Sequence, residues 1–132
     1  MPTLLALAGT RSPAHVDGVN LVSALRGQAQ VIREWLHFEH ATCYAPSQAY
    51  HALTDGRFKY IWRPLDGQEQ LFDLDEDPRE EHDLSHGSDA SLAVLKEWRA
   101  RLVKRLARRP EGFSKDGKLV PGRKYPPLTS ES

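Results

Sequence analysis

The sequence lacks several features that would indicate a disulfide-bonded, membrane-spanning or nucleic-acid-binding protein. Its 132 residues include one cysteine and one methionine, and no apolar run approaches the roughly 20 residues that a membrane-spanning helix needs. A single cysteine excludes an internal disulfide framework. Eighteen basic and eighteen acidic side chains cancel, so the net charge gives no reason to expect nucleic acid or anionic lipid. We therefore expect no nucleic-acid partner and no membrane partner.

The N-terminal stretch MPTLLALAGTRS also lacks the basic region that opens a signal peptide, and its apolar part is short for one. The bacterial cytoplasm and the periplasm both remain compatible with the sequence. Pro2 suits the first turn of a helix, Leu4, Leu5 and Leu7 supply apolar contacts, and Gly9 is a natural end. Because so short a helix is marginal alone, we expect it to pack against a larger body.

The region between this helix and residue 40 predicts a loop, a short helical turn and then a strand. The loop and turn occupy residues 10–32 and contain the turn signal Asp17-Gly18. Aromatic and β-branched residues predict the strand over residues 31–40. If this segment is extended, His37 and Glu39 share one face and His40 points to the other.

The clearest local signal is a pair of turn dipeptides, Asp55-Gly56 and Asp66-Gly67, which bracket aromatic-rich runs. In the run between the two turns, alternation places three aromatic residues on one face, namely Phe58, Tyr60 and Trp62. Pro64 cannot donate to a sheet ladder and so marks the end of this run. We predict an antiparallel meander with strands at about 49–54, 57–63 and 69–74.

A long helix follows, capped by Ser88 or Asp89 and running to about Leu106. Its apolar stripe has helical spacing and consists of Leu92, Leu95, Trp98 or Arg99, Leu102 and Leu106. The predicted fold class is therefore α+β: a small antiparallel sheet of three or four strands with one long C-terminal amphipathic helix. We divide the chain into a linker at 1–30, an α+β subdomain at 31–109 and an extended arm at 110–132.

Residues 37–43, HFEHATC, contain the side chains that are the best candidates for metal binding or catalysis. His37, His40 and Cys43 are possible zinc ligands, but no second ligand pair completes a closed site. Cys43 is also a possible nucleophile with His37 or His40 as its base, although lone cysteines are more often small buried hydrophobes. Structural histidines and a structural cysteine are the simpler interpretation, and we predict no catalytic residue and no metal site.

Two other patterns have simple structural interpretations. Asp73, Asp75 and Asp77 match the start of an EF-hand calcium loop, but Pro78 stands where that loop needs glycine and Leu84 where it needs glutamate. The run RFKYIWR alternates basic and aromatic residues, as a nucleic-acid stacking surface would. A strand separates the two sets onto opposite faces, which favours core aromatics with Lys59 and Arg63 extending into solvent.

Two consecutive motifs resemble the C-terminal part of the sulfatase family, the arylsulfatases and related hydrolases of the alkaline-phosphatase superfamily. The first is LTDGRFKYIW, which is similar to a T-D-G-R-x-K-Y strand, and the second is EQLFDLDEDPREEHDL, which is similar to L-(F/Y)-D-L-x-x-D-P-x-E. The matching positions are Thr54, Asp55, Gly56, Arg57, Lys59, Tyr60, Leu71, Phe72, Asp73, Leu74, Asp77, Pro78, Glu80, Asp83 and Leu84. The opening MPTLLALAG and the tail RPEGFSKDGKLVPGR resemble neighbouring parts of the same family, so that the resemblance covers nearly the whole chain.

The resemblance implies that the chemistry resides elsewhere. Sulfatases hydrolyse sulfate esters with a formylglycine made from a C-x-(P/A)-x-R motif and with a divalent metal, calcium, in a larger N-terminal domain. Cys43 begins a near-match to that motif, but Ser47 stands where arginine is required and the order along the chain is wrong. Met1 falls inside the family's D-I-x-P-T motif, which points to a truncated form, a damaged gene or a misplaced start. The resemblance also implies that a strand like H-x-E-H faces the substrate side, so His37, Glu39 and His40 are candidate substrate-binding residues of a cleft wall.

Three hypotheses follow from the sequence. The leading one is a structural, cleft-completing C-terminal subdomain of a sulfatase-type sulfuric ester hydrolase, inactive alone, whose partner is the sulfatase catalytic domain. The second is a binding module that reuses this fold and self-associates through its apolar docking face. The third is a small zinc enzyme centred on His37, His40 and Cys43.

Overall fold

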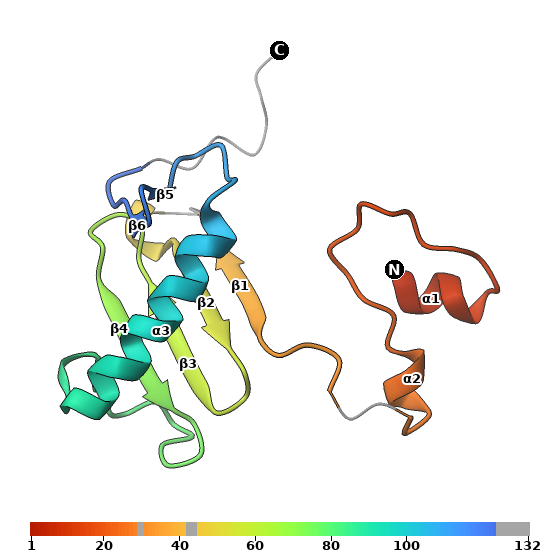
Figure 1. The fold of residues 1–132 in the computed structure, drawn as a ribbon, viewed down its shortest axis with the longest axis horizontal. Helices are drawn as coiled ribbons and strands as arrows, with labels where there is room; N and C mark the ends of the chain where they lie inside the picture. Colours follow the sequence, from red (N-terminus) through yellow and green to blue (C-terminus); the bar gives the residue numbers. More distant parts are fainter. Residues whose placement is uncertain (29–30, 42–44, 124–132) are drawn as a thin grey trace. The chain divides into compact units, whose positions relative to one another are not determined.

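The computed structural model describes residues 1–28, 31–41 and 45–123, and the chain forms two compact units, Met1–Glu34 and Trp35–Ser132 (Figure 1). The first unit holds two short helices, α1 (Pro2–Leu7) and α2 (Val22–Leu25). The Leu21 N–H donates to Thr3 Oγ1 at 3.0 Å and thereby ties the start of α2 to α1. The predicted short helix is confirmed. Among the described residues, no helix has the length and apolar character needed to cross a membrane.

The second unit is built on a four-stranded antiparallel sheet with strand order β1-β2-β3-β4. Its strands are β1 (Leu36–His40), β2 (Tyr50–Thr54), β3 (Phe58–Trp62) and β4 (Glu69–Asp73). The predicted meander and the α+β fold class are confirmed. The strand predicted from residue 31 begins only at Leu36, because Leu36 pairs with Thr54 and β2 then ends in the turn. No strand partner remains for residues 31–35.

Helix α3 (Asp89–Leu106) crosses one face of this sheet (Figure 1). Ser88 caps it, since its Oγ accepts a hydrogen bond from the Ser91 N–H. The core between helix and sheet contains Leu53, Tyr60, Trp62 and Leu71 from the strands and Leu95, Trp98, Leu102 and Leu106 from α3. The predicted stripe is wrong at Leu92, whose side chain is 41% exposed, and Trp98 rather than Arg99 occupies the core position.

Arg99 instead reaches a polar cluster at the margin of the core. It donates two hydrogen bonds to the Glu69 carboxylate at 2.6 and 2.7 Å, and the Tyr60 hydroxyl donates to the same carboxylate. Burial of the phenol and its bond to Glu69 raise the pKa of Tyr60. The cluster thus supplies the buried Tyr60 hydroxyl with a partner and joins α3 to β3 and β4.

The segment after α3 contains structure that the sequence analysis missed. Strands β5 (Ser114–Lys115) and β6 (Lys118–Leu119) form a hairpin whose turn has positive φ at Asp116 and Gly117. Phe113, just before it, has no exposed surface and meets the Trp62 ring edge-on at 6.0 Å. Two 3-10 turns complete the unit, Pro46–Gln48 and Leu84–His86.

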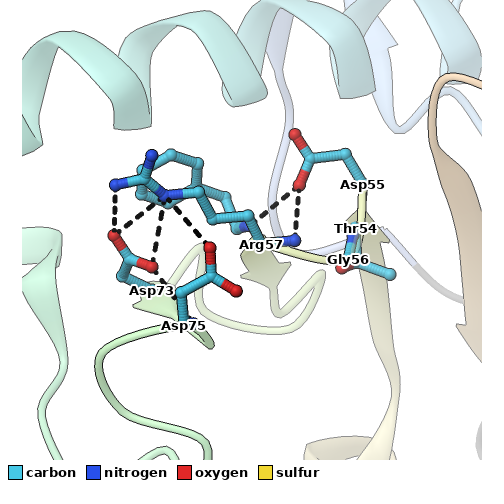
Figure 2. Close-up of polar contacts among 7 residues, drawn as sticks. Thr54, Asp55, Gly56, Arg57, Asp73 and Asp75 are labelled. Carbon is cyan, nitrogen blue, oxygen red and sulfur yellow. Dashed lines mark hydrogen bonds and ion pairs between the residues drawn. The ribbon is translucent and has the colours of Figure 1, made fainter.

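The first motif of the sulfatase resemblance builds the turn between β2 and β3 (Figure 2). Asp55 Oδ1 accepts the backbone N–H groups of Arg57 and Phe58 at 3.0 and 2.8 Å, and Gly56 lies at φ +102. Arg57 then spans to the end of β4, where Nη2 lies 3.0 Å from Asp73 Oδ2, and Asp75 is 3.9 Å from Nε. These side chains fix the turn and the relative position of the three strands.

The second motif folds the connection between β4 and α3. Glu80, at φ 58, accepts two hydrogen bonds from Lys59 Nζ at 2.7 and 2.9 Å. Asp77 accepts the His82 N–H at 2.7 Å, and Asp83 Oδ1 accepts the N–H groups of Ser85 and Leu71. Each of these acidic side chains holds a backbone group or a cation of the same fold and so stabilises the connection.

We predict that Leu102→Ala destabilises the chain far more than Leu92→Ala. Leu102 has no exposed surface, and its truncation leaves a cavity that costs about 2–5 kcal/mol. Leu92 offers a matched control on the same helix, with an expected change of about 0.5 kcal/mol or less. Urea unfolding followed by circular dichroism measures both values, and equal losses would contradict the observed orientation of α3.

We also predict a pH-dependent contribution from Asp73. The hydrogen bond from Arg57 lowers the pKa of Asp73, so the native state favours the ionised carboxylate. Its stabilisation is present above the unfolded-state pKa and is lost as pH falls through the lower native pKa. The difference in unfolding free energy between wild type and Asp73→Asn should therefore shrink between about pH 5 and pH 2. Asp75→Asn, at a side chain 68% exposed, is the control and should show little change; a pH-independent Asp73 effect would refute the ion-pair explanation.

Candidate functional site

The candidate residues of β1 project alternately from the two faces of the sheet. His37 and Glu39 lie on the face covered by α3: Arg105 Nε is 3.4 Å from His37 Nδ1, and Arg109 holds both Glu39 oxygens at 2.8 and 2.9 Å. His40 stacks on Tyr50 of β2, with ring centroids 5.6 Å apart. The predicted alternation is therefore present: His37 and Glu39 lie on one face of the edge strand and His40 lies on the other.

The structure adds His51, which the sequence analysis did not single out. His51 lies directly opposite Glu39 in the β1–β2 pairing and has no exposed surface. Its Nδ1 is 3.1 Å from His37 Nε2, and the two imidazole rings stack at 5.3 Å. On its other sides it meets the rings of Trp62 at 5.8 Å and Phe113 at 5.2 Å. Two histidines that are 14 residues apart thus form one pair.

Burial keeps both imidazoles of this pair neutral at neutral pH. Desolvation lowers the pKa of His51 to about 4, and Glu39 opposes that shift. Desolvation followed by the positive charge of Arg105 lowers the pKa of His37. Because each neutral imidazole carries one N–H, one of the two facing nitrogens donates a hydrogen bond and the other accepts it.

Arg109 organises the carboxylates around the histidine pair. Besides Glu39 it binds Glu111, with Nη2 to Oε1 at 2.6 Å, and this hydrogen bond lowers the pKa of Glu111. The cluster therefore contains two carboxylates and two guanidinium groups, those of Arg105 and Arg109, around the neutral pair. One nitrogen of His37, one of His51 and a Glu39 oxygen all lie within 4.8 Å of one another.

The sequence-based zinc and nucleophile hypotheses rested partly on Cys43, which lies outside the described residues. Of the other proposed zinc ligands, His37 and His40 belong to opposite faces of the sheet. The structure thus does not bring His37 and His40 together, and it replaces His40 by His51 as the neighbour of His37. The antiparallel register, rather than local spacing, creates this grouping.

Two recesses of equal volume lie apart from these histidines, and the first of them borders the end of the sheet. This first recess has a volume of about 620 Å³ between α3, the β3–β4 turn and the β5–β6 hairpin, and Trp62, Arg99 and Lys118 are among its lining residues. Arg99 is already bound to Glu69. The lining of this recess contains no cysteine, serine or histidine, whereas Ser85 and His86 line the second recess of the same volume.

Comparison with known proteins places the chain among sulfatases, although no family model matches it. It is 32% identical over 129 residues to an arylsulfatase of Clostridium perfringens, covering 98% of this chain and 26% of the relative. It is 31% identical over 119 residues to a Delta 4,5-hexuronate-2-O-sulfatase of Bacteroides thetaiotaomicron, covering 86% of this chain and 24% of the relative. The chain thus spans about a quarter of the length of these relatives.

Solved structures agree. A Bacteroides thetaiotaomicron protein assigned to the sulfatases matches with a TM-score of 0.74 and 28% identity over 85% of this chain and 24% of that one. A phosphonate monoester hydrolase of Agrobacterium radiobacter shares the fold, with a TM-score of 0.62 and 24% identity over 81% of this chain and 24% of that one. The sequence relatives and the fold support the same conclusion: the chain matches the C-terminal region of sulfatases.

Proposed function

We propose that this chain is the scaffold that completes the substrate cleft of a sulfatase-type sulfuric ester hydrolase, and that it does not hydrolyse sulfate esters by itself. The proposal rests on one observation: the residues of the sulfatase motif form contacts that stabilise the fold. Asp55, Arg57, Lys59 and Asp73 are engaged in turns and ion pairs that hold the sheet. Residues that are engaged in maintaining the fold suit a supporting role. Catalysis, in contrast, needs a nucleophile, a metal and sulfate-binding cations together.

The residues present do not fit the family's metal or its nucleophile. Calcium takes six to eight oxygen ligands. In the described ranges, the one set of three candidate ligands comprises His37, Glu39 and His51 and supplies two nitrogens. The formylglycine motif fails in the sequence, because Ser47 replaces its arginine. We therefore assign the metal and the formylglycine to the catalytic domain of the hydrolase and none to this chain.

The uncovered face of the edge strand β1 is the surface we propose for docking that catalytic domain. Leu36 and Phe38 are 44% and 51% exposed there, on the side opposite α3. In the described sheet, β1 pairs on one side with β2, which leaves its outer backbone groups available for a partner. The chain spans about a quarter of the length of its sulfatase relatives, so we expect the remaining part of such a protein to cover this face of β1.

Docking at this edge would bring both faces of β1 beside the cleft. His40 would contribute from the open face, and His37 and Glu39 from the face that α3 covers. These three residues are the proposed cleft wall, where they would contact the alcohol part of a sulfate ester by hydrogen bonds. Arg105 and Arg109 position His37 and Glu39, respectively.

The decisive prediction concerns hydrolysis of an aryl sulfate. The isolated 132-residue chain should show no turnover above buffer. Fusion to the Clostridium perfringens arylsulfatase from which the matching quarter has been removed should restore hydrolysis, because the scaffold then supports a complete catalytic domain. The same fusion carrying Leu102→Ala is the control for a folded scaffold. Turnover by the isolated chain would overturn the proposal.

A second prediction concerns the exposed edge. The isolated chain should bind an apolar dye and should sediment with a concentration-dependent increase in mass, since Leu36 and Phe38 lack their partner. Phe38→Ser should reduce both effects, whereas Leu65→Ser, at a side chain 47% exposed in the β3–β4 turn, should not. A stable dimer that persists at high dilution would instead favour a self-associating module. A monomer that excludes the dye would contradict the docking surface.

A further inference from the structure

We propose that His37, Glu39 and His51 form a binding site for a zinc-class divalent cation. The proposal goes beyond the scaffold function; it shares His37 and Glu39 with the proposed cleft wall, but its readout, metal binding by the chain, is separate from sulfate ester hydrolysis. It rests on the spacing of three ligand atoms, on the burial of the site and on the chemistry of the donors.

The spacing suits a small tetrahedral ion. Zinc binds imidazole nitrogen at about 2.0–2.1 Å, which places two nitrogen ligands about 3.3 Å apart. His37 Nε2 and His51 Nδ1 are 3.1 Å apart, and a Glu39 oxygen completes a set within 4.8 Å. The two imidazoles can therefore hold an ion after side-chain shifts of a few tenths of an ångström, whereas the Glu39 carboxylate must move further; the backbone register of β1 and β2 stays unchanged.

The surroundings favour a metal ligand over a freely moving side chain. His51 has no exposed surface and is fixed between the rings of Trp62 and Phe113. Glu39 is held by two hydrogen bonds from Arg109, which leaves carboxylate lone pairs for another partner. Glu39 is exposed and His37 is half-buried, so that an ion reaches the site from solvent. Three protein ligands leave a fourth position open.

The metal would replace the hydrogen that His37 Nε2 donates to His51. Arg105 can only donate, so His37 Nδ1 accepts from it and His37 Nε2 carries the hydrogen shared with His51. When the ion binds Nε2, that hydrogen moves to His37 Nδ1, and Arg105 must withdraw from it. His37 stays neutral overall, so binding releases no proton from the pair.

The charges facing the site set its strength. Arg105 and Arg109 oppose a dication, whereas Glu39 and Glu111 favour it. Two imidazole donors select zinc and its neighbours over calcium and magnesium, which prefer oxygen. We therefore expect weaker binding than at a closed structural zinc site, with selectivity retained.

The test is calorimetric titration of the 132-residue chain with zinc chloride, with cobalt absorption spectra reporting coordination. Wild type should bind one ion, and excess calcium should not compete. Loss of an outer ligand partner typically costs about 10–100-fold in metal affinity, so removing a direct ligand in His37→Gln should cost at least about tenfold. His40→Gln, the same change on the opposite face of the same strand, should bind like wild type.

Arg105→Gln gives a prediction of opposite sign. The glutamine oxygen can accept the hydrogen that metal binding places on His37 Nδ1, and a positive charge is removed, so the zinc affinity should rise by about tenfold. His51→Gln, checked for folding by circular dichroism, should abolish binding; if it unfolds, His37→Gln decides. Absence of zinc binding by wild type, equal affinity in His37→Gln, or equal losses in His37→Gln and His40→Gln would overturn the site.

Discussion

The contact between one face of α3 and one face of the sheet is the constraint on which the other features depend. Tyr60 and Trp62 of β3 pack against the buried stripe of α3. Phe113, which follows α3 in the chain, is buried in the same core. Because the interior of a protein is close-packed, this contact fixes the rotation of α3 as well as its position. That rotation brings Arg99 to Glu69 and, in the last turn of the helix, Arg105 to His37.

The residues of the sulfatase motif keep the strands of the sheet in register, which the contact with α3 requires. Arg57 joins the β2–β3 turn to the end of β4, and Lys59 joins β3 to the connection that leads to α3. A slip of one residue would move every side chain of a strand to the other face. The motif residues therefore act on architecture, and a phosphonate monoester hydrolase has the same fold.

Local signals predicted most of the fold. The Asp-Gly turns, the alternation around Tyr60 and the Ser88 cap each act within a few residues, and the corresponding elements are present. The position of Leu92 and the burial of Phe113 depend on packing between distant segments, which spacing alone does not contain. The same holds for the candidate site: the alternation of His37 and Glu39 was predictable, but the contact with His51 arises from the register of two strands.

We propose that the sheet and α3 form a scaffold that folds without the catalytic part of a sulfatase. Hydrogen exchange of the isolated chain, followed by nuclear magnetic resonance, tests this claim most directly. We expect the slowest amides in β2, β3 and α3, around Leu53, Tyr60 and Leu102, to exchange together at the free energy of global unfolding. Rapid exchange of these amides in the folded chain, or separate protection of the sheet and of α3, would contradict it.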